Sequence, residues 1–181
     1  MEARRLLVLD ACCVINLCAT GRAEEILGAL PYLCAVVQYV LDDEALSIGL
    51  EGGGPEERER TDLTALVGAG LLEVKSPSTA EEIAEHVRFA LELDEGEAQT
   101  CAVAAVHRAA VATDDRKALR LIEREGLVAV QTPELLHSWA EDCGPGEDQL
   151  CETLHRVESL ASFRPRQSSP FGNWWHRLSE P

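Results

Sequence analysis

The stretch LLVLDACCVINL, residues 6–17, decides the fold of this chain. Its first four residues, Leu6 to Leu9, are all apolar and do not alternate with polar ones, which is the pattern of a strand buried on both faces in a parallel sheet. Asp10 follows at once, and a second apolar segment begins after it. Asp10 is therefore predicted to stand where a strand ends and a helix begins. A carboxylate at such a point either caps the helix or belongs to a ligand site, because ligand sites gather at the carboxyl edge of parallel sheets.

A second apolar stretch, far along the chain, ends in the same way. Residues 109–113 (AAVAT) run directly into Asp114 and Asp115, and residues 116–125 have the pattern of a helix. A strand followed by carboxylates at the start of a helix is the arrangement already predicted at Asp10. The chain therefore delivers acidic side chains at two separate strand ends.

A third acidic position, Glu97, lies between these two strands. The stretch LDEGEA (93–98) opens an Ala-rich helix, and Glu97 falls in its first turn. If both strands belong to one parallel sheet, Asp10, Glu97 and either Asp114 or Asp115 converge at its carboxyl edge. Clustered carboxylates repel one another unless a cation joins them, and hard oxygen ligands favour Mg²⁺ or Mn²⁺.

Three segments resemble the PIN-domain nucleases, a family that includes the VapC-type toxins of bacterial toxin–antitoxin pairs. They are LVLDACCVINL (7–17), LDEGEAQTCAVAA (93–105) and VATDDRKALRL (111–121), and they stand in the family's order. The resemblance spans residues 5–140. It implies a three-layer α/β/α sandwich around a mostly parallel central sheet. It also implies a metal-dependent ribonuclease whose catalytic residues and Mg²⁺ or Mn²⁺ ligands are drawn from Asp10, Glu97, Asp114 and Asp115, the choice between the last two being open.

Three further positions gain a role from the same resemblance. The family has an acidic residue shortly after its second strand, which corresponds here to Asp43 or Glu44, although acids are also favoured at an exposed helix start. Asn16 matches a frequent polar position of the family, where it would orient a ligand or a water molecule, or else cap its own helix. Thr113 would hydrogen-bond a metal ligand or a water molecule, or else pack at the end of its strand.

The net charge of the chain is unfavourable for an unselective nucleic-acid binder. With 16 Lys and Arg against 32 Asp and Glu, the formal net charge is −16, and affinity for phosphate comes largely from basic side chains. Arg116, Lys117 and Arg120 are a local exception, because they directly follow the second acidic strand end. They either contact nucleic acid or form a solvated helix face. The acidity does not exclude the cleavage of RNA.

Cysteine usage and hydropathy bear on the cellular compartment. The 7 cysteines are an odd number without CxxC spacing, which disfavours a disulfide framework or a zinc site. One of them, Cys12, is a departure from the PIN pattern, which often has Ser or Thr two residues after the first Asp. No apolar run reaches the length of a membrane span, and the charged N-terminus leads into a strand too short for a signal peptide. A cytoplasmic location is expected.

The rest of the chain alternates strand and helix patterns, which favours an α/β sandwich. Strands are predicted at 32–37, 71–74 and 127–130, and helices at 12–19, 22–30, 38–48, 62–67, 79–91, 132–140 and 147–163. Ser78 is the predicted N-cap of the helix through Leu91, in the capping-box-like pattern Ser78-Thr79-Ala80-Glu81. Residues 49–59, with three successive glycines and a proline, are predicted to be a loop.

The sequence predicts that the chain divides into two segments near Gly144-Pro145-Gly146. Residues 1–142 are predicted to be the PIN-like domain, and residues 143–181 an extension made of one amphipathic helix and a polar tail. The tail holds the adjacent Trp174 and Trp175. Such a pair docks on the domain itself, on a partner protein or a second subunit, or stacks on bases.

Other classes of function remain open at this point. A catalytically weak or inactive PIN-like module for protein–protein interaction would agree with the acidity, with Cys12 and with the tryptophans of the tail. A receiver-like phosphoacceptor domain would need a later strand-end Asp and a Lys, but Gln131-Thr132-Pro133 follows the last predicted strand. The nuclease hypothesis leads us to expect RNA as substrate, and an antitoxin, another protein or a second copy of the chain as partner.

Overall fold

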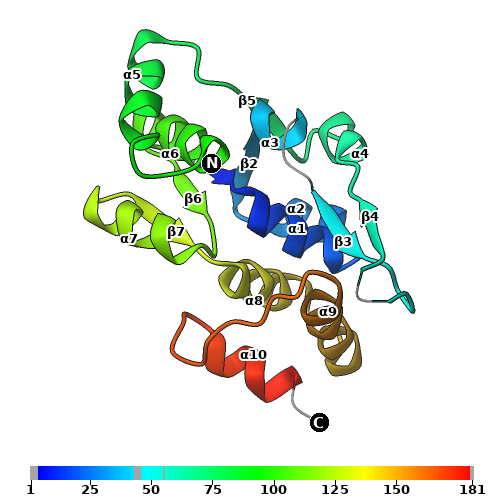
Figure 1. Ribbon diagram of the computed structural model, residues 1–181. Helices are drawn as coiled ribbons and strands as arrows, with labels where there is room; N and C mark the ends of the chain where they lie inside the picture. Colours follow the sequence, from blue (N-terminus) through cyan, green and yellow to red (C-terminus); the bar gives the residue numbers. More distant parts are fainter. Residues whose placement is uncertain (1–3, 43–45, 55, 180–181) are drawn as a thin grey trace.

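A parallel sheet forms the centre of the molecule. The computed structural model describes residues 4–42, 46–54 and 56–179, and Figure 1 shows its elements. The strand order in the central sheet is β5-β2-β1-β6-β7, with every neighbouring pair parallel. The strands are β1 (Arg5–Leu9), β2 (Tyr32–Val37), β5 (Glu73–Lys75), β6 (Ala110–Ala112) and β7 (Val128–Val130). Leu7, Val8 and Leu9 of β1 are buried in the middle of the sheet, as its unbroken apolar run predicts.

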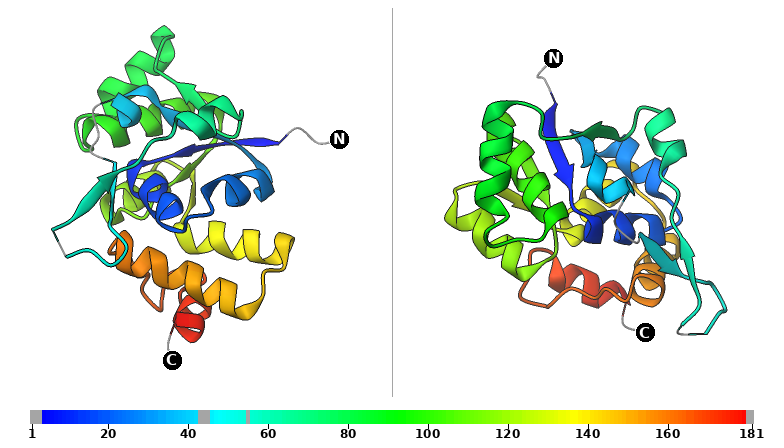
Figure 2. Two further views of the ribbon diagram at one scale, coloured as in Figure 1. Left: turned by 90° about the vertical axis from the view of Figure 1, so that its right-hand side faces the viewer. Right: turned by 45° about the horizontal axis from the view of Figure 1, so that its top comes forward.

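Helices cover both faces of this sheet, which confirms the predicted three-layer α/β/α sandwich. The helices α1, α2 and α8 pack together on one face, and α5, α6 and α7 lie on the other (Figure 2). Their bounds are α1 Ala11–Ala19, α2 Ala23–Ala29, α5 Ala80–Phe89, α6 Glu95–His107, α7 Arg116–Arg124 and α8 Thr132–Cys143. The Ala-rich α6 contacts β1, β2 and β6. Its Ala98, Ala102 and Ala104 are fully buried, since small side chains let the helix approach the sheet closely.

The segment between β2 and β5 differs from the prediction. The helix predicted at 38–48 ends at Asp42 as α3 (Gln38–Asp42), and residues 43–45 lie outside the described ones. Ser47–Gly49 is strand β3 instead and pairs antiparallel with β4 (Arg58–Arg60). The loop predicted at 49–59 is therefore too long, because Gly49, Arg58 and Glu59 are strand residues of a hairpin. The register joins Ile48 to Glu59 through backbone hydrogen bonds, which do not depend on an apolar pattern. Helix α4 (Thr64–Gly68) follows.

The predicted start of α5 is also corrected by one residue. Thr79, not Ser78, is the N-cap: its hydroxyl oxygen accepts a hydrogen bond from Glu82 N at 3.1 Å. The Glu82 carboxylate in turn accepts one from Thr79 N at 2.9 Å. Glu82, rather than Glu81, therefore completes the capping box.

The C-terminal segment packs against the rest of the chain. Helix α9 (Glu147–Leu160) contacts α1 and β3, and α10 (Gly172–Ser179) contacts α9. Trp175 is fully buried, and its Nε1–H donates a hydrogen bond to Glu158 Oε1 at 2.8 Å. Trp175 therefore docks on the chain itself. Among the described residues, the helices are too short or too polar for any of them to cross a membrane.

Candidate functional site

The strand order places a reversal of the chain between β1 and β6. The chain moves from β1 outward to β2 and β5, and then crosses back to β6 on the other side of β1. In open parallel sheets, the crevice at the carboxyl ends of the strands on either side of such a reversal is the usual place for ligands. Leu9 pairs with Ala112 in the register, so Asp10 and Thr113 leave the sheet side by side.

Asp10 is a buried carboxylate that caps α1. Its Oδ1 accepts a hydrogen bond from Ala11 N at 2.8 Å, and its Oδ2 accepts one from the Cys12 thiol at 3.3 Å. Burial raises the pKa of Asp10, and the hydrogen bonds that reach the carboxylate oppose that rise. Asp10 is held in one orientation and is costly to keep charged without a cation.

Thr113 connects the two strand ends. Its buried hydroxyl donates to Asp10 Oδ2 at 2.9 Å and accepts from Asp115 N at 3.2 Å. The one side chain thus fixes the position of Asp10 and the path of the backbone into Asp115. This contact agrees with the predicted role of Thr113 as a hydrogen-bond partner of a candidate metal ligand.

The two neighbouring acids after β6 point to different surroundings. Asp115 is exposed and is the N-cap of α7, with its Oδ1 accepting from Lys117 N at 2.7 Å and from Ala118 N at 2.9 Å. Its charge contributes to the raised pKa of Glu97. Asp115 therefore adds negative charge beside Glu97.

Asp114 instead ties α1 to the start of α8. Its Oδ1 accepts from Thr132 N at 3.0 Å, and its Oδ2 accepts from Asn16 Nδ2 at 3.0 Å, from the Cys13 thiol at 3.4 Å and from the Thr132 hydroxyl. Burial raises the pKa of Asp114, and these hydrogen bonds oppose the rise. Asn16 contacts Asp114 and Thr132, and the structure shows no hydrogen bond from it to Asp10 among the described residues. Sequence reasoning missed Thr132, whose only signal was its position after the last strand.

Glu97 lies in the first turn of α6, as predicted. Its backbone N–H donates to Asp94 Oδ1 at 2.9 Å, and its carboxylate accepts from Asp94 N at 3.3 Å, which makes a capping box. Burial raises the pKa of Glu97 to about 7, and the negative charges of Asp94, Asp10 and Asp115 add to the rise. Asp10, Glu97 and Asp115 therefore belong to one electrostatically coupled group, which we call the acidic cluster.

A second set of metal-binding atoms lies beside the acidic cluster. Among the described residues, the sulfur atoms of Cys12 and Cys13 and a carboxylate oxygen of Asp114 form the one group of three or more His, Cys, Asp or Glu side chains whose ligand atoms lie within 4.8 Å of one another. Cys13 is fully buried, and burial raises the pKa of its thiol far above the usual range. The acidic cluster is more open than this group.

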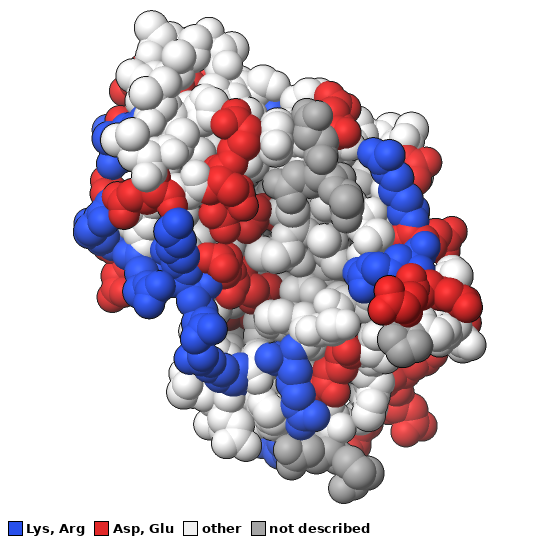
Figure 3. Space-filling model, viewed as in Figure 1, with Lys and Arg blue, Asp and Glu red and all other residues white. Residues whose placement is uncertain are grey.

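The predicted basic residues Arg116, Lys117 and Arg120 are exposed on α7. Arg124, on the same helix, pairs with Glu92 at 2.6 Å and with Glu125 at 3.3 Å. Figure 3 shows Lys and Arg side chains in a band over α7 and the loop before α10, next to a group of acidic side chains. The predicted candidates Asp43 and Glu44 lie outside the described residues.

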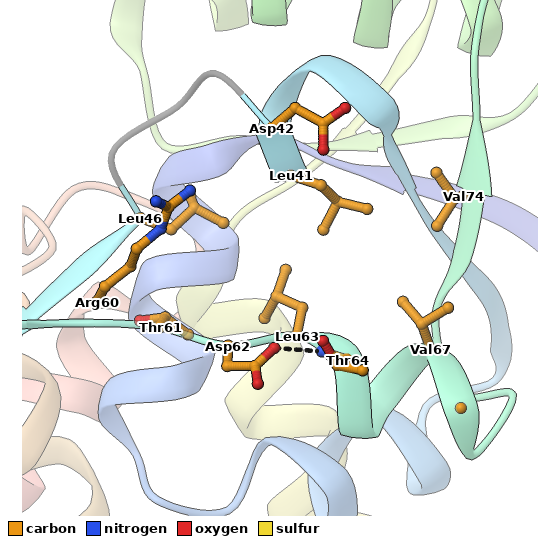
Figure 4. Close-up of a pocket in the computed structure, with 11 residues that line it drawn as sticks. Leu41, Asp42, Leu46, Arg60, Thr61, Asp62, Leu63, Thr64, Val67 and Val74 are labelled. Atoms are coloured by element: carbon orange, nitrogen blue, oxygen red, sulfur yellow. Dashed lines mark hydrogen bonds between the residues drawn. The ribbon is translucent and has the colours of Figure 1, made fainter.

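A roomy pocket lies away from the acidic cluster. It has a volume of 640 Å³ and is bounded by α3, the β3–β4 hairpin, α4 and β5 (Figure 4). Leu41, Leu63 and Val74 line it, and Asp62 Oδ1 accepts a hydrogen bond from Thr64 N at 2.8 Å on its wall. None of Asp10, Glu97, Asp114 and Asp115 lines this pocket. Its lining mixes apolar side chains with the charged Asp42, Arg60 and Asp62.

No protein-family model, curated protein or solved structure matches this chain. The resemblance to the PIN-domain nucleases thus stays a prediction from the sequence motifs.

Proposed function

We propose that this protein is a metal-dependent endoribonuclease that hydrolyses phosphodiester bonds of RNA at the acidic cluster. The observation that supports it most is the coupling of Glu97 to Asp10 and Asp115 at the chain reversal between β1 and β6. The negative charges of Asp10 and Asp115 add to the raised pKa of Glu97, and a divalent cation bound between such carboxylates would relieve their repulsion.

The donor atoms of the cluster fit a hard cation. Asp10, Glu97 and Asp115 offer carboxylate oxygens, for which Mg²⁺ and Mn²⁺ are the matching ions. A cation bound there would lower the pKa of a coordinated water molecule and polarise a phosphate. Thr113 holds Asp10 in position by its hydrogen bond, and the capping box with Asp94 holds Glu97. The chain needs no nucleophilic side chain of its own for this chemistry.

The choice of RNA as substrate rests on the sequence resemblance and on the charge beside the cluster. Arg116 and Lys117 follow Asp115 directly, so basic side chains lie next to the acidic ones on a chain whose net charge is −16. Basic side chains are the groups that hold a nucleic-acid backbone. A role as the toxin of a toxin–antitoxin pair, with an antitoxin as protein partner, is part of the same proposal.

The test compares cleavage of a fluorescent single-stranded RNA with Mn²⁺ and with EDTA. We expect cleavage by the wild type only with the metal, and none by Asp10→Asn. Asp62→Asn is the matched control, because Asp62 also accepts a backbone hydrogen bond at a helix start but lines the distant pocket. Equal cleavage by the wild type and Asp10→Asn, or no cleavage across several RNAs and metals, would contradict the proposal.

A second candidate function is a PIN-like protein–protein interaction module without catalysis. The observation that favours it is the tighter grouping of Cys12, Cys13 and Asp114, whereas the acidic cluster has no set of three ligand atoms within 4.8 Å of one another among the described residues. In that case Asp10→Asn would leave the binding of a protein partner unchanged, which pull-down with both proteins would show.

A further inference from the structure

Three arginines from two distant parts of the chain surround a small pocket beside the acidic cluster. Arg116 begins α7, and Arg164 and Arg166 lie in the loop between α9 and α10. The pocket, which we call the arginine pocket, has a volume of 160 Å³, and Asp114 and Gln131 also line it. The adjacency of Asp114 to Asp115 places this pocket next to the acidic cluster.

Hydrogen bonds and packing hold the loop that carries two of these arginines. The carbonyl oxygen of Arg166 accepts from Ser169 N at 3.0 Å and from Ser169 Oγ at 2.6 Å. His176 Nε2 lies 2.7 Å from the carbonyl oxygen of the buried Pro165. Phe163 packs edge-on against Trp175 with ring centroids 5.8 Å apart. These contacts fix the loop in place, so it forms a defined wall of the pocket.

The charges around the pocket leave an excess of positive charge. Arg164 lies 3.6 Å from Glu158, so its charge is partly balanced. Neither Arg116 nor Arg166 has an ion pair with another residue in the described part of the chain. Asp114 faces the pocket wall, but both of its oxygens are occupied by hydrogen bonds from Thr132 and α1. A chain with a net charge of −16 that gathers the guanidinium groups of Arg116 and Arg166 here offers a site for an anion.

The size of the pocket and its neighbours indicate which anion. A volume of 160 Å³ is well below the roughly 300–1,000 Å³ of pockets that enclose a whole drug-sized ligand, so a single small group fits. The guanidinium fork matches phosphate oxygens. Lys117 and Arg120 line the next hollow along α7, so the basic side chains continue away from the pocket. The N–H groups at the starts of α7 and α8 are already capped by Asp115 and Asp114, which leaves the arginines as donors.

We propose that the arginine pocket binds one phosphodiester group of a single-stranded RNA whose chain crosses the acidic cluster. This inference rests on the proposed nuclease function and adds the path of the RNA across the surface. That path runs from the acidic cluster over the start of α7 to the loop between α9 and α10. The extension after α8 thus supplies part of the substrate-binding surface.

The test measures RNA binding separately from cleavage. A fluorescent single-stranded RNA is titrated with Asp10→Asn protein in Mg²⁺, and its anisotropy is followed at several salt concentrations. The double variant Arg116→Ala/Arg166→Ala, added to this background, is expected to bind about tenfold or more weakly. The slope of log affinity against log salt concentration should fall by about 0.7 for the lost phosphate contact. Arg177→Ala, an exposed arginine of α10 that does not line the pocket, should leave both unchanged.

The outcomes separate this inference from the proposed function. Metal-dependent cleavage together with unchanged binding by the double variant would overturn the arginine pocket as an RNA site and leave the nuclease standing. No binding and no cleavage by the otherwise folded wild type would overturn both. Inorganic phosphate is the competitor: if it displaces the RNA at concentrations near the dissociation constant of the RNA, the pocket is a site for free phosphate, and the assignment to a phosphodiester fails.

Discussion

The hydroxyl of Thr113 donates a hydrogen bond to Asp10 Oδ2 at 2.9 Å and so joins two residues that are 103 positions apart in the chain. The hydroxyl oxygen of Thr113 also accepts a hydrogen bond from Asp115 N at 3.2 Å. The Thr113 side chain therefore connects the ends of two neighbouring strands, and the geometry of the acidic cluster depends on it.

Replacing Thr113 by Val should lower metal-dependent cleavage about 10–100-fold, the usual cost of removing a residue that orients a metal ligand. The shape of the side chain is nearly kept, so the loss would come from the missing hydrogen bonds to Asp10 and Asp115. Single-turnover cleavage with saturating Mn²⁺ measures it. Thr100→Val is the matched control, because Thr100 is equally buried but its hydroxyl has no hydrogen-bond partner among the described residues. A loss of equal size in both variants would assign the effect to packing.

Asp114 and Asp115 should respond differently to substitution. Asp114→Ala removes the acceptor of the Thr132 N–H and one of the two acceptors of Asn16 Nδ2 in a buried place, at a cost of about 1–3 kcal/mol in the free energy of unfolding. At about 2–4 °C per kcal/mol, calorimetry will detect the change in Tm. Asp115→Asn keeps an acceptor for the start of α7 and should remove cleavage with a smaller change in Tm. The reverse ranking of the two variants would show that Asp114 is the acid of the site.

The raised pKa of Glu97 predicts a pH-dependent stability of the metal-free protein. The usual pKa is 4.5 and the folded-state pKa is about 7, so between these values the folded protein binds more protons than the unfolded chain. The free energy of unfolding should therefore fall as the pH rises through this window. Thermal unfolding of wild type and Glu97→Gln in EDTA at pH 5 and pH 8 checks this: the wild type should lose more stability over that range. Added Mg²⁺ should raise the Tm of the wild type at pH 8 and have little effect on Glu97→Gln. A parallel pH profile of the two proteins would refute the coupling.

The two adjacent tryptophans of the tail should differ strongly in their contribution to stability. Trp175→Ala removes a fully buried ring and the hydrogen bond to Glu158, with an expected loss of about 3–5 kcal/mol. Trp174 is partly exposed and forms a T-shaped pair with His137, with ring centroids 5.0 Å apart, so Trp174→Ala should cost clearly less. Urea unfolding of both variants measures the difference. Equal, small losses would mean that α10 is docked only loosely in solution.

The strongest elements of the fold could be predicted because their signal is local. The unbroken apolar run of β1 predicts a strand that is buried on both faces, and the structure has it at the centre of the sheet. The hairpin of β3 and β4 could not be predicted in this way. Arg58, Glu59 and Arg60 are all exposed, and the pair is held by backbone hydrogen bonds that carry no side-chain pattern.

The candidate site also has features that could be predicted from local sequence and features that could not. The position of Asp10 at a strand end could be predicted from its neighbours alone. The difference between Asp114 and Asp115 could not, because Thr132, which lies 18 positions further on, determines the orientation of Asp114. The loop arginines that face Arg116 belong to an extension whose packing on α1 depends on contacts across the whole chain. A local motif cannot predict the orientation of a side chain when residues far away in the sequence determine that orientation.

The central place of β1 has a consequence for biosynthesis. β1 is made before its partner β6, which comes more than a hundred residues later, and the last wall of the arginine pocket comes after α9. A nascent chain therefore carries Asp10 through the synthesis of about a hundred further residues before the neighbours that complete the acidic cluster exist. Contacts between such distant segments also make folding slow. On this topology, the acidic cluster and the arginine pocket are complete only after α9 and the loop that follows it have been made.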